Sequence, residues 1–339
     1  MSLHFVGIGD LHLDGKLRKY LPDLNQRIIS EVEKCFDYAR RNGIKLVVFY
    51  GDICDVPHMS ADAARSLVHL MTAHKDLQQI YITGNHDIES NEVHSMQLFI
   101  DLCATGVLPN VRVIDKPVTL FRKSGTPLRL LPWPSLETEK ESLNVIHEGV
   151  AGAVWDGGRP VESGKVIKHW TVGGHLHSNQ VIGKVHFSGT LYQTSFGERP
   201  RKYFHDVRWD EPEDKPVIQS IKCNPGFKLI NLKIETVDDL SKIEDNPNFL
   251  YKVFVQADVV LDSNTFDGKT NVVKVNSYKT KTELEELIHE ELRMDDEFDI
   301  EAAMSVETNL KQWLLKAKAD DALKRAAFKK YRQITTSNV

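Results

Sequence analysis

The sequence predicts an α/β protein in which layered sheets are flanked by helices. Through roughly the first 200 residues, short apolar runs of strand length alternate with longer segments of helical periodicity. The hydrophobic fraction of 41% and the charged fraction of 27% are typical of a globular protein with a sizeable core. The length of 339 residues predicts about two domains rather than one.

The elements of the first half are expected to alternate between strand and helix. The strand-like segments are short and apolar, whereas the helical segments place apolar side chains three and four positions apart. Gly43 is expected to end the first helix and Ser60 to open the second. Strands are expected over residues 3–8, 44–50 and 79–83, and helices over residues 24–41, 60–74 and 92–103.

The pattern changes beyond about residue 200. Prolines punctuate a charged stretch, EPEDKP, which we interpret as a connector between domains. Strands are then expected over residues 228–235, 250–257 and 271–278, with short helices near residues 237–243 and 281–293. The sequence therefore predicts a first domain of residues 1–209, a small α+β domain of residues 210–282 and a helical tail of residues 283–339.

Charge and cysteine content exclude several classes of protein. The chain has 43 Lys and Arg residues against 48 Asp and Glu residues, a net charge of −5, so it is not a uniformly basic nucleic-acid-binding protein. A polyanionic partner would have to meet a local basic patch or bound metal cations. The four cysteines form no CxxC pair, no apolar run reaches 18 residues, and the first residues lack the basic start of a signal peptide. These features favour a cytoplasmic protein with reduced thiols and no membrane-spanning segment.

Five strand-like runs each end in a polar cluster. The clusters are GDLH at residues 9–12, GDICD at 51–55, GNHD at 84–87, HEG at 147–149 and GHLH at 174–177. In α/β sheets, ligands gather outside the carboxyl ends of strands, so these side chains are expected to share one rim. The residues delivered there are Asp10, His12, Asp52, Asn85, His86, His147, His175 and His177.

The chemistry of these side chains is that of metal ligands. They supply imidazole nitrogens, carboxylate oxygens and one amide oxygen but no thiolate, a set that suits Mn²⁺, Fe²⁺ or Zn²⁺ and argues against a structural zinc site. Within the DxH and HxH pairs, both side chains face one ion if the backbone is extended. Seven or more such ligands are too many for one four-coordinate ion and fit two ions that share a bridging carboxylate.

The order of the motifs resembles a known superfamily. The pattern DxH…GDxxD…GNHD…H…GHxH is similar to that of the calcineurin-like metallophosphoesterases. Within that superfamily, GDICDVPHMS with Pro57 and Ser60, the form VIHEG and the form GGHLH resemble the SbcD-type nucleases of the meiotic recombination eleven family. The motifs cover about residues 5–180, and the remainder resembles the family's capping domain and ATPase-docking segment in layout only.

The resemblance implies a role for each motif residue. The first metal ion would be held by Asp10, His12 and His177, and the second by Asn85, His147 and His175. Asp52 would bridge the two ions, which would be Mn²⁺, or Mg²⁺ in its place. His86 would be the catalytic residue that faces the scissile phosphate. Asp55 stands where some relatives have a histidine, and we assign it no role.

The resemblance also implies an activity and partners. The chain would be an Mn²⁺-dependent DNA exonuclease and endonuclease that hydrolyses phosphodiester bonds at DNA ends in double-strand-break repair, recombination and recombination-dependent replication. Its partner would be an SbcC-type (Rad-fifty-type) ATPase, bound through the helical tail, with a homodimer of the nuclease inside a heterotetramer. The location would be the cytoplasm, or the host cytoplasm for a viral protein. Arg199, Arg201 and Lys202 either contact DNA or form a solvated loop.

Two other functions compete with this interpretation. A phosphatase of the same superfamily would share the metal ligands, but such enzymes usually place arginines beside the Asn-His motif, and GNHDIESNE contains none. A non-catalytic recombination scaffold would predict a broken ligand set, whereas each ligand position here is filled.

Overall fold

The computed structural model describes residues 2–90, 93–121, 125–156, 158–161, 164–210, 215–262, 264–285 and 287. The helices expected in the tail beyond residue 287 lie outside the described residues, so that expectation stays a prediction. Within the described residues, no helix combines the length and the apolar character needed to cross a bilayer.

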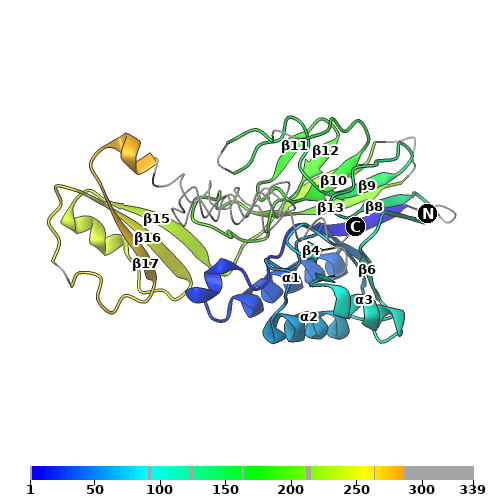
Figure 1. The fold of residues 1–339 in the computed structure, drawn as a ribbon, viewed down its shortest axis with the longest axis horizontal. Coiled ribbons are helices and arrows are strands. Elements are labelled where there is room, and N and C mark those ends of the chain that lie inside the picture. Colours follow the sequence, from blue (N-terminus) through cyan, green and yellow to red (C-terminus); the bar gives the residue numbers. More distant parts are fainter. Residues whose placement is uncertain are drawn as a thin grey trace, which may run out of the picture. The chain divides into compact units, whose positions relative to one another are not determined.

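The first sheet has six strands in the order β14-β13-β1-β2-β3-β6. Four neighbours run parallel: β1 (Leu3–Ile8), β2 (Leu46–Phe49), β3 (Gln78–Ile82) and β6 (Val111–Ile114). On the other side of β1, β13 (Tyr203–Trp209) pairs antiparallel with it, and β14 (Val217–Lys222) pairs antiparallel with β13. Helices α1 (Leu24–Arg41), α2 (Ala61–Ala73) and α3 (Gln97–Ala104) lie together on one side of this sheet (Figure 1).

The second sheet also has six strands, in the order β11-β12-β10-β9-β8-β7. Parallel neighbours β8 (Leu128–Leu131), β9 (Leu143–His147), β10 (Thr171–Gly174) and β12 (Val185–Phe187) form its centre. Short antiparallel strands, β7 (Val118–Leu120) and β11 (Gln180–Ile182), form its edges.

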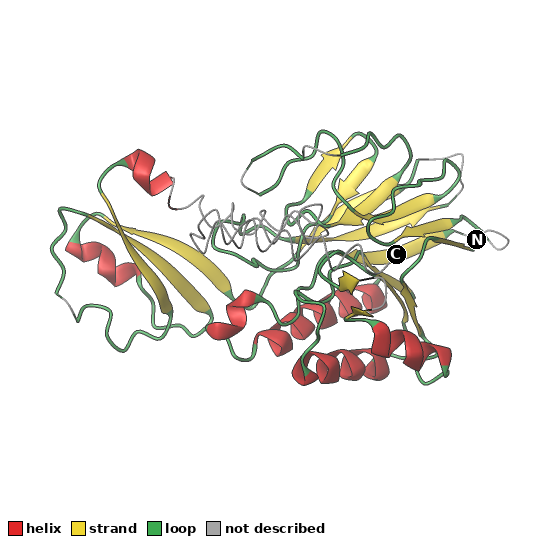
Figure 2. Cartoon of the chain, in the orientation of Figure 1, coloured by secondary structure: helices red, strands yellow, loops and turns green. Residues whose placement is uncertain are grey.

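The two sheets pack face to face, as Figure 2 shows. Their shared core contains Phe5 and Val48 from the first sheet and Val145 and Val172 from the second. Along β2, Val48 enters this core while its neighbours Val47 and Phe49 enter the core beneath the helices. This alternation of period two is why an almost wholly apolar strand is buried on both of its faces. The predicted fold class, layered sheets flanked by helices, is confirmed.

The small elements complete the described chain. A three-stranded parallel sheet consists of β15 (Lys228–Ile234), β16 (Phe249–Gln256) and β17 (Val272–Tyr278). The remaining elements are the two-stranded pair β4 (Ile88–Ser90) and β5 (Val93–His94) and the 3-10 helices η1 (Lys16–Lys19) and η2 (Val237–Lys242).

One boundary differs from the sequence-based expectation. We expected the first domain to end at residue 209 and the stretch after it to connect two domains. Instead, β14 continues the first sheet to Lys222, because β13 and β14 pair antiparallel. The charged stretch therefore joins two strands of one sheet. The division of the rest of the chain into a small domain and a tail stays a prediction.

Candidate metal centre

The predicted site residues follow five strands whose carboxyl ends lie at one rim. Strands β1, β2 and β3 are neighbours in the first sheet, and β9 and β10 are neighbours in the second. Asp10, Asp52 and Asn85 come two or three residues after β1, β2 and β3, whereas His147 is the last residue of β9 and His175 follows β10 directly. Because the sheets pack face to face, the two rows of strand ends meet.

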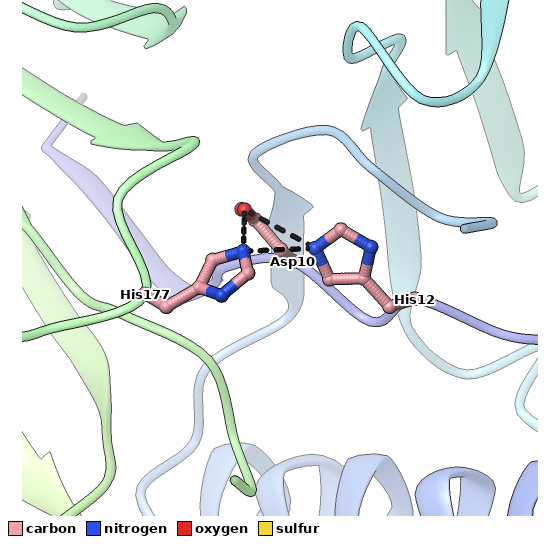
Figure 3. A group of neighbouring side chains, drawn as sticks. All are labelled: Asp10, His12 and His177. Carbon is pink, nitrogen blue, oxygen red and sulfur yellow. Dashed lines mark hydrogen bonds and ion pairs between the residues drawn. The ribbon is translucent and has the colours of Figure 1, made fainter. Parts of the chain in front are cut away.

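The first group of side chains is Asp10, His12 and His177. The Nε2 atoms of His12 and His177 lie 3.0 Å apart. Asp10 Oδ2 lies 3.8 Å from His12 Nε2 and 3.6 Å from His177 Nε2. Figure 3 shows that all three ligand atoms point at one another. Three convergent nitrogen and oxygen donors, with Asp10 and His12 almost fully buried, fit the donor set of a divalent metal ion.

The second group is Asn85, His147 and His175. Asn85 Oδ1 lies 2.9 Å from His147 Nε2 and 2.9 Å from His175 Nδ1. His147 is fully buried, and its Nδ1 donates to the backbone carbonyl of Tyr50 at 2.6 Å. In the neutral ring, this hydrogen bond leaves the Nε2 lone pair of His147 directed at the group, as a metal ligand requires.

The carboxylate of Asp52 lies between the two groups. Its Oδ2 is 3.1 Å from His147 Nε2 and 3.9 Å from His12 Nε2. Its Oδ1 accepts a 2.9 Å hydrogen bond from the backbone N–H of His86. One oxygen therefore reaches both groups while the other is held by the backbone. The structure thus brings together all seven residues that the sequence suggested as ligands, with the Asp52 carboxylate between the two groups; the binding of metal by these residues stays a prediction.

Two glycines make room for these carboxylates. A Cβ atom on Gly84 would lie 2.1 Å from Asp52 Oδ1, and one on Gly174 would lie 2.3 Å from Asp10 Oδ1. Both distances are far below van der Waals contact, so only glycine leaves the space that the carboxylates occupy.

The backbone of the site is not extended at His12 or His175, so the condition under which the side chains of the DxH and HxH pairs would face one ion is not met. His12, Asp52 and His175 have φ angles of 48°, 45° and 78°. Left-handed conformations of non-glycine residues cost about 1–3 kcal/mol each and persist where surrounding contacts impose them. Here the backbone N–H of His12 donates to the Asp52 carbonyl at 3.0 Å, and that of His175 donates to Asp10 Oδ1 at 3.0 Å. The ligands converge because of these bends, not because of an extended chain.

The charges of the site shift several pKa values. Burial disfavours the charged form of His147, but Asp52 and Asp10 outweigh it and raise its pKa to about 10. Burial is likewise outweighed at His177, where Glu198 in particular raises the pKa to about 10. The same attraction holds the pKa of Asp52 well below its usual range, although burial opposes it. In the metal-free group the Asp52 carboxylate therefore stays anionic, whereas the raised pKa values favour protonated rings at His147 and His177, and a bound metal ion would displace those protons.

Sequence reasoning missed two carboxylates next to the first group. Asp55 Oδ1 lies 3.0 Å from His12 Nδ1, although we had assigned Asp55 no role. Glu198 Oε1 lies 2.9 Å from His177 Nδ1, and nothing in the sequence singled out Glu198. The groups His12–Asp55–His86 and Asp156–His177–Glu198 also have ligand-like spacing, but each shares one histidine, His12 or His177, with the first group.

Lys202 is a correction to the sequence analysis. We grouped it with Arg199 and Arg201 as a possible DNA contact, and those two arginines are exposed. The Lys202 side chain is only 2% exposed and forms an ion pair with Glu198. It also donates to Thr190 Oγ1 at 2.8 Å. A buried, paired ammonium of this kind supports the site from within rather than forming part of a solvated surface loop.

Asp87 is a further residue that the sequence analysis overlooked. Its Oδ2 accepts the N–H groups of Gly84 at 2.9 Å and Ile53 at 3.2 Å. Its Oδ1 accepts the N–H of Cys54 at 2.9 Å and the Ser95 hydroxyl at 2.9 Å. Asp87 therefore ties together the two loops that carry Asp52 and Asn85.

His86 lies beside the site and differs from the candidate ligands. Its Nδ1 is 3.1 Å from the carbonyl of Asp55, and its side chain is 29% exposed. Its ring centroid lies 4.9 Å from that of His12. Within the described residues its Nε2 makes no hydrogen bond, so that atom is available to a substrate.

Comparisons with known proteins agree with this geometry. A family model described as calcineurin-like phosphoesterase matches residues 3–185, a range that contains all seven candidate ligands. Exonuclease subunit 1 of Enterobacteria phage T4 is 26% identical over 230 residues. The match covers 60% of this chain and 64% of that relative, so the chain spans less than two thirds of the relative's length.

Proposed function

The chain belongs to the calcineurin-like phosphoesterase family, and from that premise we propose that it is a metal-dependent DNA nuclease. The observation that carries the proposal is the position of Asp52, whose Oδ2 faces His147 at 3.1 Å and His12 at 3.9 Å. A carboxylate between two groups of nitrogen and oxygen ligands suits a pair of metal ions, as this family uses.

We assign the ligands as the sequence suggested. Asp10, His12 and His177 hold one ion, Asn85, His147 and His175 hold the other, and Asp52 bridges them. Two Mn²⁺ ions suit the mixed imidazole and carboxylate ligands, and Mg²⁺ is the alternative. When bound, such a pair lowers the pKa of a water molecule and offsets the negative charge of a phosphodiester.

His86 is the residue we propose to act on the substrate directly. Because its Nδ1 faces the Asp55 carbonyl, which can only accept, Nδ1 carries a hydrogen and Nε2 points elsewhere. In the protonated ring, Nε2 can donate a hydrogen bond or a proton to the phosphate or to the leaving 3′-oxygen. The partial exposure of His86 fits contact with a substrate better than burial as a ligand.

DNA is the proposed substrate because the phage relative is named an exonuclease subunit. Arg199 and Arg201 are exposed and offer positive charge to the DNA backbone. The word subunit in that name also supports an assembly, and we propose an SbcC-type ATPase as the partner in double-strand-break repair and recombination. Co-elution of the purified chain with such an ATPase tests the partner separately from the chemistry.

The main alternative is a phosphatase that acts on phosphomonoesters with the same metal ions. The test is digestion of end-labelled duplex DNA in Mn²⁺ beside hydrolysis of p-nitrophenyl phosphate and of its bis-ester. We expect cleavage of the DNA and the bis-ester, and its loss with EDTA or in Asp52→Asn. His58→Ser is the matched control, because His58 lies exposed in the loop after Asp52. Efficient turnover of the monoester alone would contradict the nuclease proposal.

A further inference from the structure

We infer that Asp55 and Glu198 are positioning residues that fix the imidazoles of His12 and His177 and make the first metal site the tighter of the two. The inference rests on the ligand assignment of the proposed function and adds to it a difference between the two sites. It follows from the partners of the four histidines.

The first site has one buried or half-buried carboxylate behind each histidine. Asp55 Oδ1 is 3.0 Å from His12 Nδ1, and Glu198 Oε1 is 2.9 Å from His177 Nδ1. Both Nδ1 atoms lie on the side of the ring away from Asp10 (Figure 3). Since an ionised carboxylate can only accept, each Nδ1 must carry the hydrogen. In a neutral ring the lone pair then resides on Nε2, which is the atom that faces the other ligands.

Further contacts hold Glu198 itself. The backbone N–H of Thr194 donates to Glu198 Oε2 at 3.1 Å, and the buried ammonium of Lys202 pairs with the same oxygen. Thr190 Oγ1 and the His177 carbonyl accept from Lys202 at 2.8 and 3.2 Å. Glu198 is therefore a fixed carboxylate, and it can fix His177 in turn.

The histidines of the second site have weaker partners. His147 Nδ1 donates to a neutral backbone carbonyl, that of Tyr50, at 2.6 Å. His175 Nε2 lies 3.9 Å from Glu148, which is beyond hydrogen-bond length, and its ring rests edge-on against Trp155 at 5.1 Å between centroids. The direct ligands differ in the same sense, because the first site has Asp10 where the second has the neutral amide of Asn85.

These differences between the two sites all favour tighter metal binding at the first site. A carboxylate that accepts from a ligating histidine orients the ring and makes its other nitrogen a stronger donor, and removal of such a partner typically lowers metal affinity about 10–100-fold. Two such partners and one additional anionic ligand favour the ion at the first site. The first ion is therefore held more tightly, and the second binds at higher metal concentration.

The test is titration of the full-length, metal-free chain with MnCl₂, with free Mn²⁺ followed by electron paramagnetic resonance. We expect two binding steps in the wild type. In Asp55→Asn and in Glu198→Gln, the tighter step weakens about 10–100-fold and the weaker step changes little. Glu148→Gln is the matched control near the second site, and its tighter step stays as in the wild type.

Variants that lack a ligand of one ion show which of the two ions Asp55 and Glu198 affect. Asn85→Ala removes a ligand of the second ion only, and in this background Asp55→Asn and Glu198→Gln weaken the ion that remains. His12→Ala removes a ligand of the first ion only, and in this background Glu198→Gln has little effect on the ion that remains. Because Glu198→Gln leaves Lys202 buried without its partner, the double variant Glu198→Gln/Lys202→Met, which removes both charges, is expected to fold and to show the same weakened step.

Unchanged affinity in both variants, equal weakening of both steps, or weakening confined to the weaker step would overturn the inference. None of these readings depends on cleavage of DNA. A chain that binds two ions with this asymmetry but cleaves no DNA would contradict the proposed function and leave the inference standing.

Discussion

Removal of Asp87 should loosen the metal centre without removing a ligand. Its carboxylate accepts the backbone N–H groups of Gly84, Ile53 and Cys54, all at 3.2 Å or less, and the hydroxyl of Ser95. In Asp87→Ala the three buried amides lose their acceptor. An unsatisfied buried donor costs about 1–3 kcal/mol, and water that enters the new space recovers part of this cost. For three amides the cost before this recovery is about 3–9 kcal/mol, so we expect the free energy of unfolding to fall by about 3 kcal/mol.

Asp87→Asn should be milder, because it keeps one acceptor oxygen. The new NH₂ group can face Cys54 and Ser95, where the serine hydroxyl can rotate to accept, so one amide is left unpaired at a cost of about 1–3 kcal/mol. Urea unfolding of the metal-free chains, followed by circular dichroism, measures both values. In addition, both variants should bind Mn²⁺ more weakly, since the loops that carry Asp52 and Asn85 are no longer tied together.

The control is Asp37→Ala, which removes an exposed carboxylate whose 3.2 Å ion pair with Arg40 lies at the surface. Exposed pairs of this kind contribute at most about 1 kcal/mol. A loss of less than about 1 kcal/mol in Asp87→Ala, or equal losses in Asp87→Ala and Asp37→Ala, would refute the reasoning.

Three other predictions follow from the site and its surroundings. Asp52→Ala should remove both metal ions, because one carboxylate serves both groups, whereas His177→Ala should weaken the binding of mainly one ion. Elemental analysis of each variant measures the metal content, and two ions retained in Asp52→Ala would exclude the bridging role. His86→Ser should keep both ions and DNA binding while cleavage slows by about 10²–10⁴-fold, the usual contribution of general acid–base catalysis; a parallel loss of metal would make His86 a ligand. Burial, with a smaller contribution from His186, lowers the pKa of His205 to about 3, so this histidine stays neutral in the folded chain while the unfolded chain takes up a proton as the pH falls below about 6.5. The free energy of unfolding therefore decreases as the pH falls. In His205→Leu the decrease between pH 7.5 and 5.5, measured by urea unfolding, should be about 1.4 kcal/mol smaller than in the wild type. An identical decrease in the two proteins would contradict a neutral His205 in the folded chain.

The strands near the centre, and the meeting of the candidate ligand residues there, were predictable from sequence because their signals are local. An apolar run followed at once by a polar cluster marks a strand end, and five such runs gave the positions of Asp10, Asp52 and Asn85 before any coordinates. The antiparallel strands β13 and β14 were harder to place from sequence. Nothing within β13 shows that it pairs with β1, because pairing across about 200 residues of chain has no local signature. The place of β14 in the sheet then follows from its pairing with β13.

The carboxylates that support the candidate ligands could not be found from sequence, because their contacts also join distant parts of the chain. Glu198 lies 21 residues after His177, and Asp55 lies 43 residues after His12. Each looks like an ordinary acidic residue until the fold places it behind a ring nitrogen. Lys202 was misread because a lysine beside two arginines predicts a solvated surface, whereas the side chain turns inward to a buried glutamate. Burial of a charge depends on its partner, which the local sequence does not reveal.

The position of β1 has a consequence for how the chain reaches its folded state. β1 is synthesised before the other strands of its sheet, yet it lies in the interior of that sheet, between β2 and a strand that begins only at Tyr203. Until that strand leaves the ribosome, one edge of β1 has unpaired backbone groups and can pair with another chain. The region that matches the family, residues 3–185, ends before both β13 and Glu198. A fragment cut at residue 185 would contain all seven proposed ligands but would present an open, apolar strand edge, and it should aggregate rather than fold.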